Sequence, residues 1–380
     1  MATKTGVNFN FKDIFDKQVN EINKHRPNIL VVGKTGVGKS TLINSIFSGN
    51  IAETGVGTPV SQNLIKYEKE GVPISIWDTR GLELGEKAQK ETKSEIIKEI
   101  KELKKSDDIS KRINACWYCI NTLSNRIETE EIEWIKEIAE EMPVIIVLTQ
   151  TINKKDNTLF NKIKSYNVPY KQIVKVLAET YIIEDDDNDG NFIYKKPFGL
   201  QELSEITFQL LPEQLRNAYT AAQKVDLQKK INVAWATASS LIAGSAASAF
   251  LPTGADLAAV AAAQATMLAS ITVIFGLDFG KNFFLSVVAG IIGRAGATAG
   301  LAYFFGGLAK ASGIGYVAGG AIEATVNTAI STSLAVAYIN TCKKIISGQL
   351  ENKTDEEIVE LIKEEFIKQR KEKKPKPEGL

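Results

Sequence analysis

Residues 33–40 of this chain read Gly-Lys-Thr-Gly-Val-Gly-Lys-Ser, a complete match to the phosphate-binding loop pattern G-x-x-x-x-G-K-[ST]. The loop follows an apolar, strand-like run at 28–32 and leads directly into a helical pattern that begins at Thr41. Glycines let consecutive backbone N–H groups turn toward phosphate oxygens, and the start of the helix adds a partial positive charge. The sequence therefore predicts a strand, loop and helix that bind a nucleoside triphosphate.

The expected phosphate contacts come from the loop and from the first residue after it. They are Gly33, Lys34, Thr35, Gly36, Val37, Gly38, Lys39, Ser40 and Thr41. In such a loop the lysine reaches the β- and γ-phosphates, so Lys39 is the expected catalytic cation. The hydroxyl of Ser40 is expected to bind Mg²⁺.

A second motif, Asp78-Thr79-Arg80-Gly81, ends an apolar strand about forty residues after the loop. An acid at this place can hold Mg²⁺ through water, and the Gly81 amide can bond the γ-phosphate and report its loss. Between the two motifs lies a segment, 54–61, whose hydroxyls could complete the Mg²⁺ shell. Thr58 and Ser61 are both candidates, and the residues alone do not decide between them.

The pattern of the first 205 residues indicates an α/β domain with a mostly parallel sheet. Its expected strands are 28–33, 73–78, 113–121, 143–149 and 171–178, separated by helical patterns such as 95–105 and 129–141. The stretches 62–69 and 72–78 predict a hairpin that gives the sheet one antiparallel edge. A helix over 9–24 is expected to pack beside the first strand.

The second half of the chain differs in composition. Residues 231–342 are rich in Ala, Gly, Ser and Thr and nearly free of charge, and they predict an all-α domain. The expected divisions are a nucleotide-binding domain at 1–205, a linker helix at 206–230, a helical domain at 231–348, and a charged amphipathic helix with a basic tail at 349–380. Thr354 to Glu357 form a capping box for that last helix.

The low-charge region allows two interpretations. Uncharged stretches of about 20 residues are long enough to cross a bilayer. Yet Ala, Ser and Thr have weak transfer energies, and Asp256, Asp278 and Glu323 would be costly at the bilayer centre. The alternatives are a membrane-associated domain, slightly favoured here, and a closed bundle whose small residues permit close helix crossings. A bundle that exposes apolar helices in one nucleotide state would satisfy both.

Several other features predict little chemistry. A net charge of +1 argues against a broad nucleic-acid footprint. Cys116 and Cys119 are three positions apart on an expected strand, so their side chains face opposite sides of the sheet. This argues against a metal site or redox pair shared by the two thiols. The acidic run 185–190 resembles a calcium loop, but Lys196 replaces the required glutamate and a hairpin turn is expected. The start lacks an apolar signal-peptide core, so the nucleotide site is expected in the cytoplasm.

The loop, D-x-x-G and their spacing resemble the Era-like, septin-like and immunity-related GTPases over roughly the first 205 residues. That resemblance implies GTP and GDP as ligands, and a base-reading motif [NT]-K-x-D after the fifth strand. Here the motif position reads Thr149, Gln150, Thr151, Ile152, so the guanine-reading aspartate is absent. Asp156 could reach back from the loop, and ATP remains an alternative to GTP.

The resemblance also marks the expected site residues and the limits of catalysis. Thr149, Gln150 and Ala178 occupy the places that contact the base. Leu82 stands where related small GTPases carry a water-orienting Gln, and Gly36 replaces the Asn of potassium-dependent members. Slow intrinsic hydrolysis is expected, because positioning and charge stabilisation carry most of phosphoryl transfer. Septins and immunity-related GTPases pair their GTPase domains across the nucleotide, and the same is expected here.

The helical region, roughly 225–345, resembles an uncharacterised domain fused to bacterial Era-like GTPases, through Pro252, Gly254, Gln264, Met267 and similar positions. This implies a bacterial origin. The sequence as a whole predicts a regulatory, Mg²⁺-dependent GTPase whose nucleotide state controls the helical domain, with self-association and membrane lipid as candidate partners and no nucleic acid. The alternatives are a nucleotide-gated scaffold with negligible turnover and an ATPase.

Overall fold

The computed structural model describes residues 11–54, 56–59, 64–79, 86–184, 192–248, 256–277, 285, 320–372 and 376–378. Its contacts divide the chain into two compact units. An α/β unit spans Ile22–Asp226, and a helical unit combines Met1–Glu21 with Leu227–Leu380. The first helix, α1 (Phe11–Lys24), thus belongs mostly to the helical unit. Its Phe15 is buried in that unit's core, which corrects the expected packing beside the first strand.

The α/β unit is built on a seven-stranded sheet in the order β2-β3-β4-β1-β5-β6-β7. The strands are β1 (Asn28–Val32), β2 (Val56–Pro59), β3 (Leu64–Lys69), β4 (Val72–Thr79), β5 (Ala115–Asn121), β6 (Val144–Thr149) and β7 (Gln172–Lys175). The central pairs around β1, β5, β6 and β7 are parallel. The predicted α/β fold and its strands are therefore confirmed.

The antiparallel part of the sheet differs in one respect from the expectation. β3 and β4 form the predicted hairpin. However, β3 is not the edge strand, because β2 pairs antiparallel to its outer side. No strand was expected within residues 54–61, because a four-residue strand is too short to leave a periodic signal.

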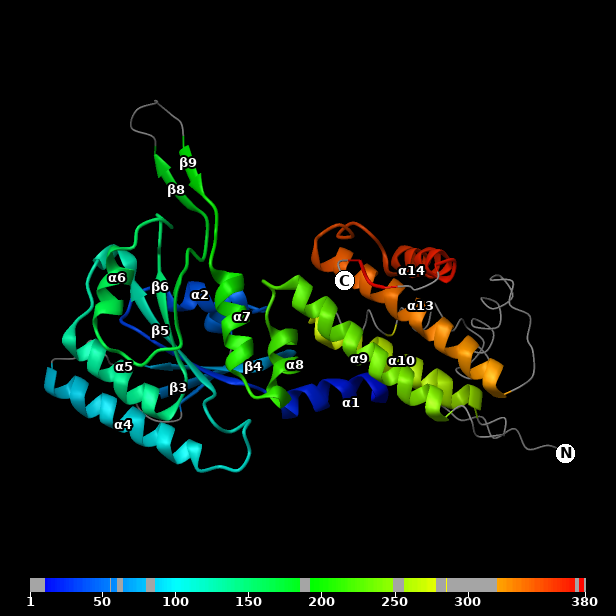
Figure 1. The fold of residues 1–380 in the computed structure, drawn as a ribbon, viewed down its shortest axis with the longest axis horizontal. Coiled ribbons are helices and arrows are strands. Elements are labelled where there is room, and N and C mark those ends of the chain that lie inside the picture. The colour runs from blue at the N-terminus through cyan, green and yellow to red at the C-terminus, as the bar shows by residue number, and fades with distance from the viewer. Residues whose placement is uncertain are drawn as a thin grey trace. The chain divides into compact units, whose positions relative to one another are not determined.

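Helices cover both faces of the sheet (Figure 1). One face packs against α4 (Glu86–Lys104), α5 (Thr129–Glu141) and α6 (Thr158–Ser165). The other packs against α2 (Lys39–Ile46), α3 (Ile51–Thr54), α7 (Leu200–Leu210) and α8 (Glu213–Ala222). The expected linker helix at 206–230 is thus replaced by the end of α7 and by α8, whose Tyr219 is buried in the sheet's core.

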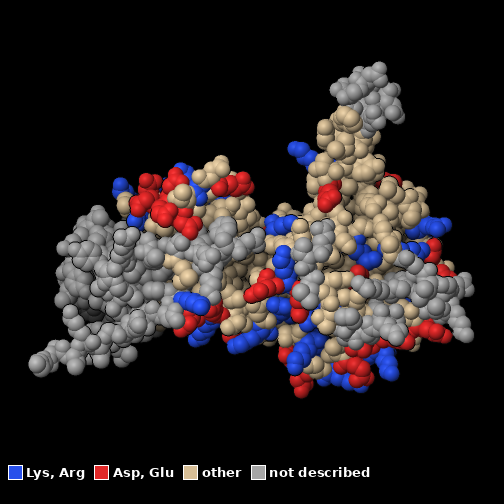
Figure 2. Space-filling view, turned by 180° about the vertical axis from the view of Figure 1, so that it is seen from behind, with Lys and Arg blue, Asp and Glu red and all other residues tan. Residues whose placement is uncertain are grey.

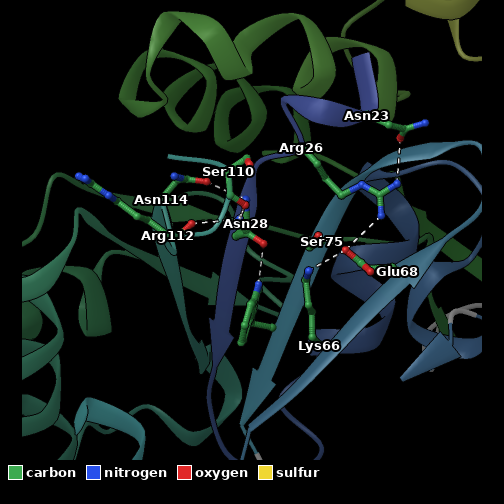
Figure 3. Close-up of polar contacts among 10 residues, drawn as sticks. Asn23, Arg26, Asn28, Lys66, Glu68, Ser75, Ser110, Arg112 and Asn114 are labelled. Atoms are coloured by element: carbon green, nitrogen blue, oxygen red, sulfur yellow. Dashed lines mark hydrogen bonds and ion pairs between the residues drawn. The ribbon is translucent and has the colours of Figure 1, made fainter. Parts of the chain in front are cut away.

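The amino end of β1 is fixed by Asn28, which is buried (Figure 3). Its backbone N–H donates to Asn114 Oδ1 at 2.7 Å, and its side-chain amide donates to the carbonyl oxygens of Ser110 and Arg112. The indole of Trp77 donates to Asn28 Oδ1 at 2.9 Å. Each polar group of the asparagine therefore has a partner from a neighbouring element, and β1 is held in register between β4 and β5.

A second polar group at the same end centres on Glu68 (Figure 3). Ser75 donates a hydrogen bond to its carboxylate at 2.7 Å, and Lys66 and Arg26 lie 2.8 and 3.1 Å away. Burial raises the pKa of Glu68, but these hydrogen bonds and charges outweigh it and lower that pKa to about 2. The glutamate stays ionised and ties β3 to β4 and to Arg26, two positions before β1.

The helical unit packs α1, α9 (Leu227–Ser248), α10 (Asp256–Phe275), α13 (Gly320–Ile346) and α14 (Asp355–Arg370) around one core. Large aliphatic and aromatic side chains form most of this core, with alanines among them, and polar side chains pair within it. Thr272 and Tyr338 share a 2.7 Å hydrogen bond, and Gln264 donates to Ser331 at 3.0 Å. The predicted capping box of α14 is confirmed at Thr354 and Glu357. Within the low-charge region 231–342, residues 249–255, 278–284 and 286–319 lie outside the described residues.

Among the helices that the structure describes, none is both long and apolar enough to cross a bilayer.

One lysine is completely buried in the helical unit. Lys230 of α9 donates to the carbonyl oxygens of Ile274 and Phe275, at 3.0 and 3.1 Å. These carbonyls end α10 and have no partner within their own helix. Burial lowers the pKa of Lys230 from 10.5 to about 7. The lysine therefore caps α10 and titrates near neutrality.

Lys230 makes the stability of the helical unit depend on pH. Between pH 7 and 10.5 the unfolded chain binds a proton at Lys230 that the folded chain does not, so stability rises with pH across this window. Urea unfolding followed by tryptophan fluorescence at several pH values measures this slope. We expect Lys230→Met to flatten it, whereas Lys229→Met, at the preceding position, keeps it. Equal slopes for both variants would contradict the assignment.

Candidate nucleotide-binding site

The loop predicted to bind phosphate connects β1 to α2, and its backbone requires glycine. Gly36 and Gly38 have φ angles of 76° and 91°, in the region that side chains avoid. At Gly33 the constraint is spatial, since a Cβ atom would lie 2.5 Å from the carbonyl oxygen of Cys119. Around Gly36 there is open space, as an approaching phosphate needs. The loop is a cradle that opens at the carboxyl end of the sheet.

Lys39 lies across this cradle. Its ammonium donates to the carbonyl oxygens of Gly33 and Lys34 at 2.8 and 3.2 Å. Because these bonds tether the cation to the loop's own backbone, its charge is held at the place where phosphate would sit. Lys39 is also the first residue of α2, whose first N–H groups have no helical partner. Ser40 is exposed at this helix end.

The end of β6 holds the loop from the side. The buried hydroxyl of Thr149 donates to the Val37 carbonyl oxygen at 2.6 Å. Gln150 donates from its side-chain amide to the Gly36 carbonyl oxygen at 3.1 Å and has a left-handed φ of 52°. The structure thus brings Thr149 and Gln150 together with the phosphate loop. Gln150 uses its amide where the family motif has a lysine.

Asn121, at the end of β5, was not singled out from the sequence. Its side-chain amide donates to Gln150 Oε1 at 3.1 Å, so it orients the residue that holds Gly36. The next residue, Thr122, shares a 2.8 Å hydrogen bond with Thr151. The available signal was the position of Asn121, since polar residues at the carboxyl ends of neighbouring parallel strands meet at one edge.

The residues expected to bind Mg²⁺ are only partly brought together. Asp78 lies near the end of β4, directly opposite Val31 of β1, so its strand ends beside the phosphate loop. Ser40, the second residue of α2, lies at the same edge. A hydroxyl and a carboxylate are the oxygen ligands that Mg²⁺ accepts, and phosphate oxygens and water supply the rest. The two residues fit the ion.

Thr58 does not lie beside the loop. It is exposed in the middle of β2, opposite Lys66, and its strand is separated from β1 by three strand spacings. These amount to about 14 Å. The other expected residues near the γ-phosphate, Ser61, Arg80, Gly81 and Leu82, lie outside the described residues.

The region expected to read the base contains no carboxylate at the family position, which is Ile152. Asp156 accepts a hydrogen bond from the backbone N–H of Thr158 at 2.9 Å, which lowers its pKa. Its carboxylate is therefore engaged at the start of α6. Ala178 is partly buried against the sheet's core. The residue before it, Leu177, forms an antiparallel β-bridge with Phe198.

The cysteine pair of β5 takes no part in this site as a ligand. Cys116 is buried on one face of the sheet and Cys119 on the other, as the alternation of a strand predicts. Burial raises the pKa of Cys119 to about 12. The positive charge of Lys39 lowers this pKa and the negative charge of Asp78 raises it, but burial is the largest cause. Both thiols stay protonated, and a shared metal or redox role is excluded by their opposite directions.

A parallel sheet with a phosphate loop between its first strand and first helix, a lysine across that loop and an aspartate on the neighbouring strand defines the class of P-loop nucleoside triphosphatases. A model of the 50S ribosome-binding GTPase family matches residues 28–150. This match covers the loop, Asp78 and Thr149. The chain therefore contains a P-loop GTPase domain of this GTP-binding family.

Curated relatives agree with this assignment. GTPase Der of Karelsulcia muelleri is 28% identical over 182 residues, 45% of this chain and 40% of that protein. GTPase Der of Neisseria meningitidis serogroup B is 35% identical over 83 residues, 20% of this chain and 17% of that protein. Septin-14 of Mus musculus is 25% identical over 151 residues, 35% of each. The chain spans less than half the length of these relatives.

The Thr149 hydroxyl is expected to be needed for nucleotide binding. Thr149→Val leaves the Val37 carbonyl without its buried donor, which costs roughly 1–3 kcal/mol. We expect about tenfold weaker binding of a fluorescent GDP analogue in equilibrium titration. Thr149→Ser keeps the hydroxyl and should bind like the unaltered protein. If the Val and Ser variants bind equally well, the hydrogen bond does not support the loop.

Proposed function

We propose that this protein is a regulatory GTPase that binds GTP with Mg²⁺, hydrolyses it slowly alone and faster when two GTPase domains pair. The observation that carries this proposal is the phosphate loop, with Lys39 tethered across it and Thr149 and Gln150 bonded to its backbone. These contacts fix a cradle for the phosphates before nucleotide arrives. Preorganisation of this kind is what phosphoryl transfer requires of a protein.

In the proposed complex the loop amides and Lys39 bind the phosphates, and Ser40 and Asp78 hold Mg²⁺. The ion, when bound, neutralises charge on the phosphate oxygens. The Gly81 amide is proposed to bond the γ-phosphate. A contact from Thr58 would need β2 to separate from β3, whereas Ser61 follows β2 in the chain. Both hydroxyls remain candidates for this contact.

Slow turnover follows from the residues that surround the γ-phosphate. Leu82 cannot orient an attacking water by hydrogen bonding, and Gly36 has no side chain to bind a potassium ion. A second GTPase domain could supply the missing charge. Arg80 is one candidate donor. Arg126 is exposed and lies 3.6 Å from Glu128, so its charge is partly compensated in the single chain.

We propose that the helical unit is the part of the protein that responds to the nucleotide state of the GTPase domain. Charge nearly vanishes over 231–342, and α9, α10 and α13 pack through an apolar core in which alanines lie among larger side chains. We propose that the nucleotide state changes how tightly these helices close, and that their apolar faces meet membrane lipid when they open. Recovery of the protein in the aqueous fraction, without detergent and with vesicles present, in both GTP and GDP would end this part of the proposal.

Phosphate release per protomer tests the switch. We expect the GTP rate to rise with protein concentration over about a hundredfold range, because a partner completes the site. Lys39→Ala is the control, with a loss of about a hundredfold or more. A flat, near-zero rate despite tight GTP binding would instead make the protein a nucleotide-gated scaffold. Faster release from ATP would assign it as an ATPase.

The base-reading position offers a second test. Ile152 cannot accept hydrogen bonds from the guanine N1–H and 2-amino groups, so GTP and ITP, which lacks the amine, should bind almost alike. We expect Ile152→Asp to improve GTP over ITP by about tenfold in competition binding, by adding the missing acceptor. Ile152→Asn is the control of similar size. No gain for the aspartate would mean that another group reads the base.

A further inference from the structure

A hairpin of two strands projects from the α/β unit (Figures 1 and 2). β8 (Tyr181–Glu184) and β9 (Phe192–Lys195) form a sheet of their own, which we call the arm. Eight large hydrophobic side chains are exposed among the described residues, and five of them lie on the arm. The five are Tyr181, Ile182, Phe192, Ile193 and Tyr194. The arm is therefore the main apolar surface of the described part of the α/β unit.

Both faces of the arm are apolar. Ile183 lies opposite Ile193 on one face, and Ile182 lies opposite Tyr194 on the other. A hairpin that had evolved to stand in water would alternate apolar and polar residues. An isolated two-stranded hairpin is also marginally stable in water. Ile182 and Tyr194 are nevertheless 54% and 60% exposed. The arm therefore has the apolar composition of a buried hairpin, but in the single chain its side chains are exposed to solvent.

The backbone of β9 adds a second observation. All four of its residues are exposed, and within the described residues its outer edge pairs with no other strand. An open edge of this kind presents unpaired N–H and C=O groups to another strand. It carries no proline that would block pairing.

The charges of the arm favour one kind of partner. Glu184 ends β8 at the far end of the hairpin, whereas Lys195 and Lys196 lie at its root. The residues connecting the strands, 185–191, contain four aspartates and no lysine or arginine. The acidic residue Glu184, at the far end of the described hairpin, opposes approach to anionic lipid or nucleic acid. Two arms placed antiparallel instead set the end of each that carries Glu184 beside the root of the other, which carries Lys195 and Lys196.

We propose that β9 of one copy pairs antiparallel with β9 of a second copy, so that two arms form a continuous four-stranded sheet. The contact is two-fold symmetric, which makes it self-complementary. It rests on the proposed pairing of GTPase domains and names the surface that pairs. The arm begins close to Ala178, which is proposed to contact the base. β8 starts at Tyr181, three positions after Ala178, and Phe198, three positions after the end of β9, bridges back to Leu177.

Cross-linking tests the pairing in the full-length protein. The native thiols Cys116, Cys119 and Cys342 are all buried, so a cysteine introduced on the arm can be labelled selectively. We expect Tyr194→Cys with a short bismaleimide to form covalent dimers at least about tenfold faster than Ile367→Cys. Ile367 is 45% exposed on α14 and serves as the matched control. Equal rates for the two variants would overturn the proposal.

A second variant gives an independent measure. Ile193→Lys with Tyr194→Lys places like charges and removes apolar area at the contact. In sedimentation velocity with a non-hydrolysable GTP analogue, we expect the dimer dissociation constant to rise by about tenfold or more. Ile367→Lys should leave it unchanged. An unchanged dissociation constant in the arm variant would also overturn the proposal.

The outcomes separate the arm from the proposed catalysis. If turnover rises with protein concentration but does not change in the arm variants, the proposed catalytic pairing stands and the proposed role of the arm in it is refuted. Arm cross-linking with flat turnover would keep the arm contact and refute catalytic pairing. Binding to phosphatidylcholine–phosphatidylglycerol vesicles that is lost in the arm variant would show a lipid surface and refute the pairing.

Discussion

The backbone of the phosphate loop is the constraint on which the site depends. Its N–H groups can face phosphate while its carbonyl groups point the other way, and hydrogen bonds to those carbonyls hold the loop in this shape. The structure supplies these partners from three directions. Lys39 takes the carbonyls of Gly33 and Lys34, Thr149 takes that of Val37, and Gln150 takes that of Gly36. The ends of β1 and β6 and the start of α2 are thereby joined.

Local patterns predicted much of this fold. The loop motif, the apolar runs of the central strands and the capping box at Thr354 depend on neighbouring residues, and each was found as expected. The helix at 129–141 agreed at both ends, and its start is set locally, because Glu128 and Glu131 form a capping box. The likeness to Era-like and septin-like GTPases was equally readable, since its motifs are short and contiguous.

Features set by distant contacts were not readable. β2 is an edge strand only because β3 lies beside it, and α8 belongs to the α/β unit because Tyr219 fills the sheet's core. The part of Gln150 in the site depends on a left-handed backbone and on Asn121, 29 positions earlier in the chain. Nothing in the local pattern around 9–24 indicated that Phe15 packs with helices more than two hundred residues away.

The helical unit is assembled from both sides of the chain, with the α/β unit inserted between Glu21 and Leu227. A ribosome delivers the chain from the amino end, and domains fold as units during synthesis. The GTPase domain can therefore be complete while the first helix still waits for α9, α10 and α13. During that interval the apolar face of α1 around Phe15 is exposed on the nascent chain. The helical unit can complete its core only after its last helices have left the ribosome.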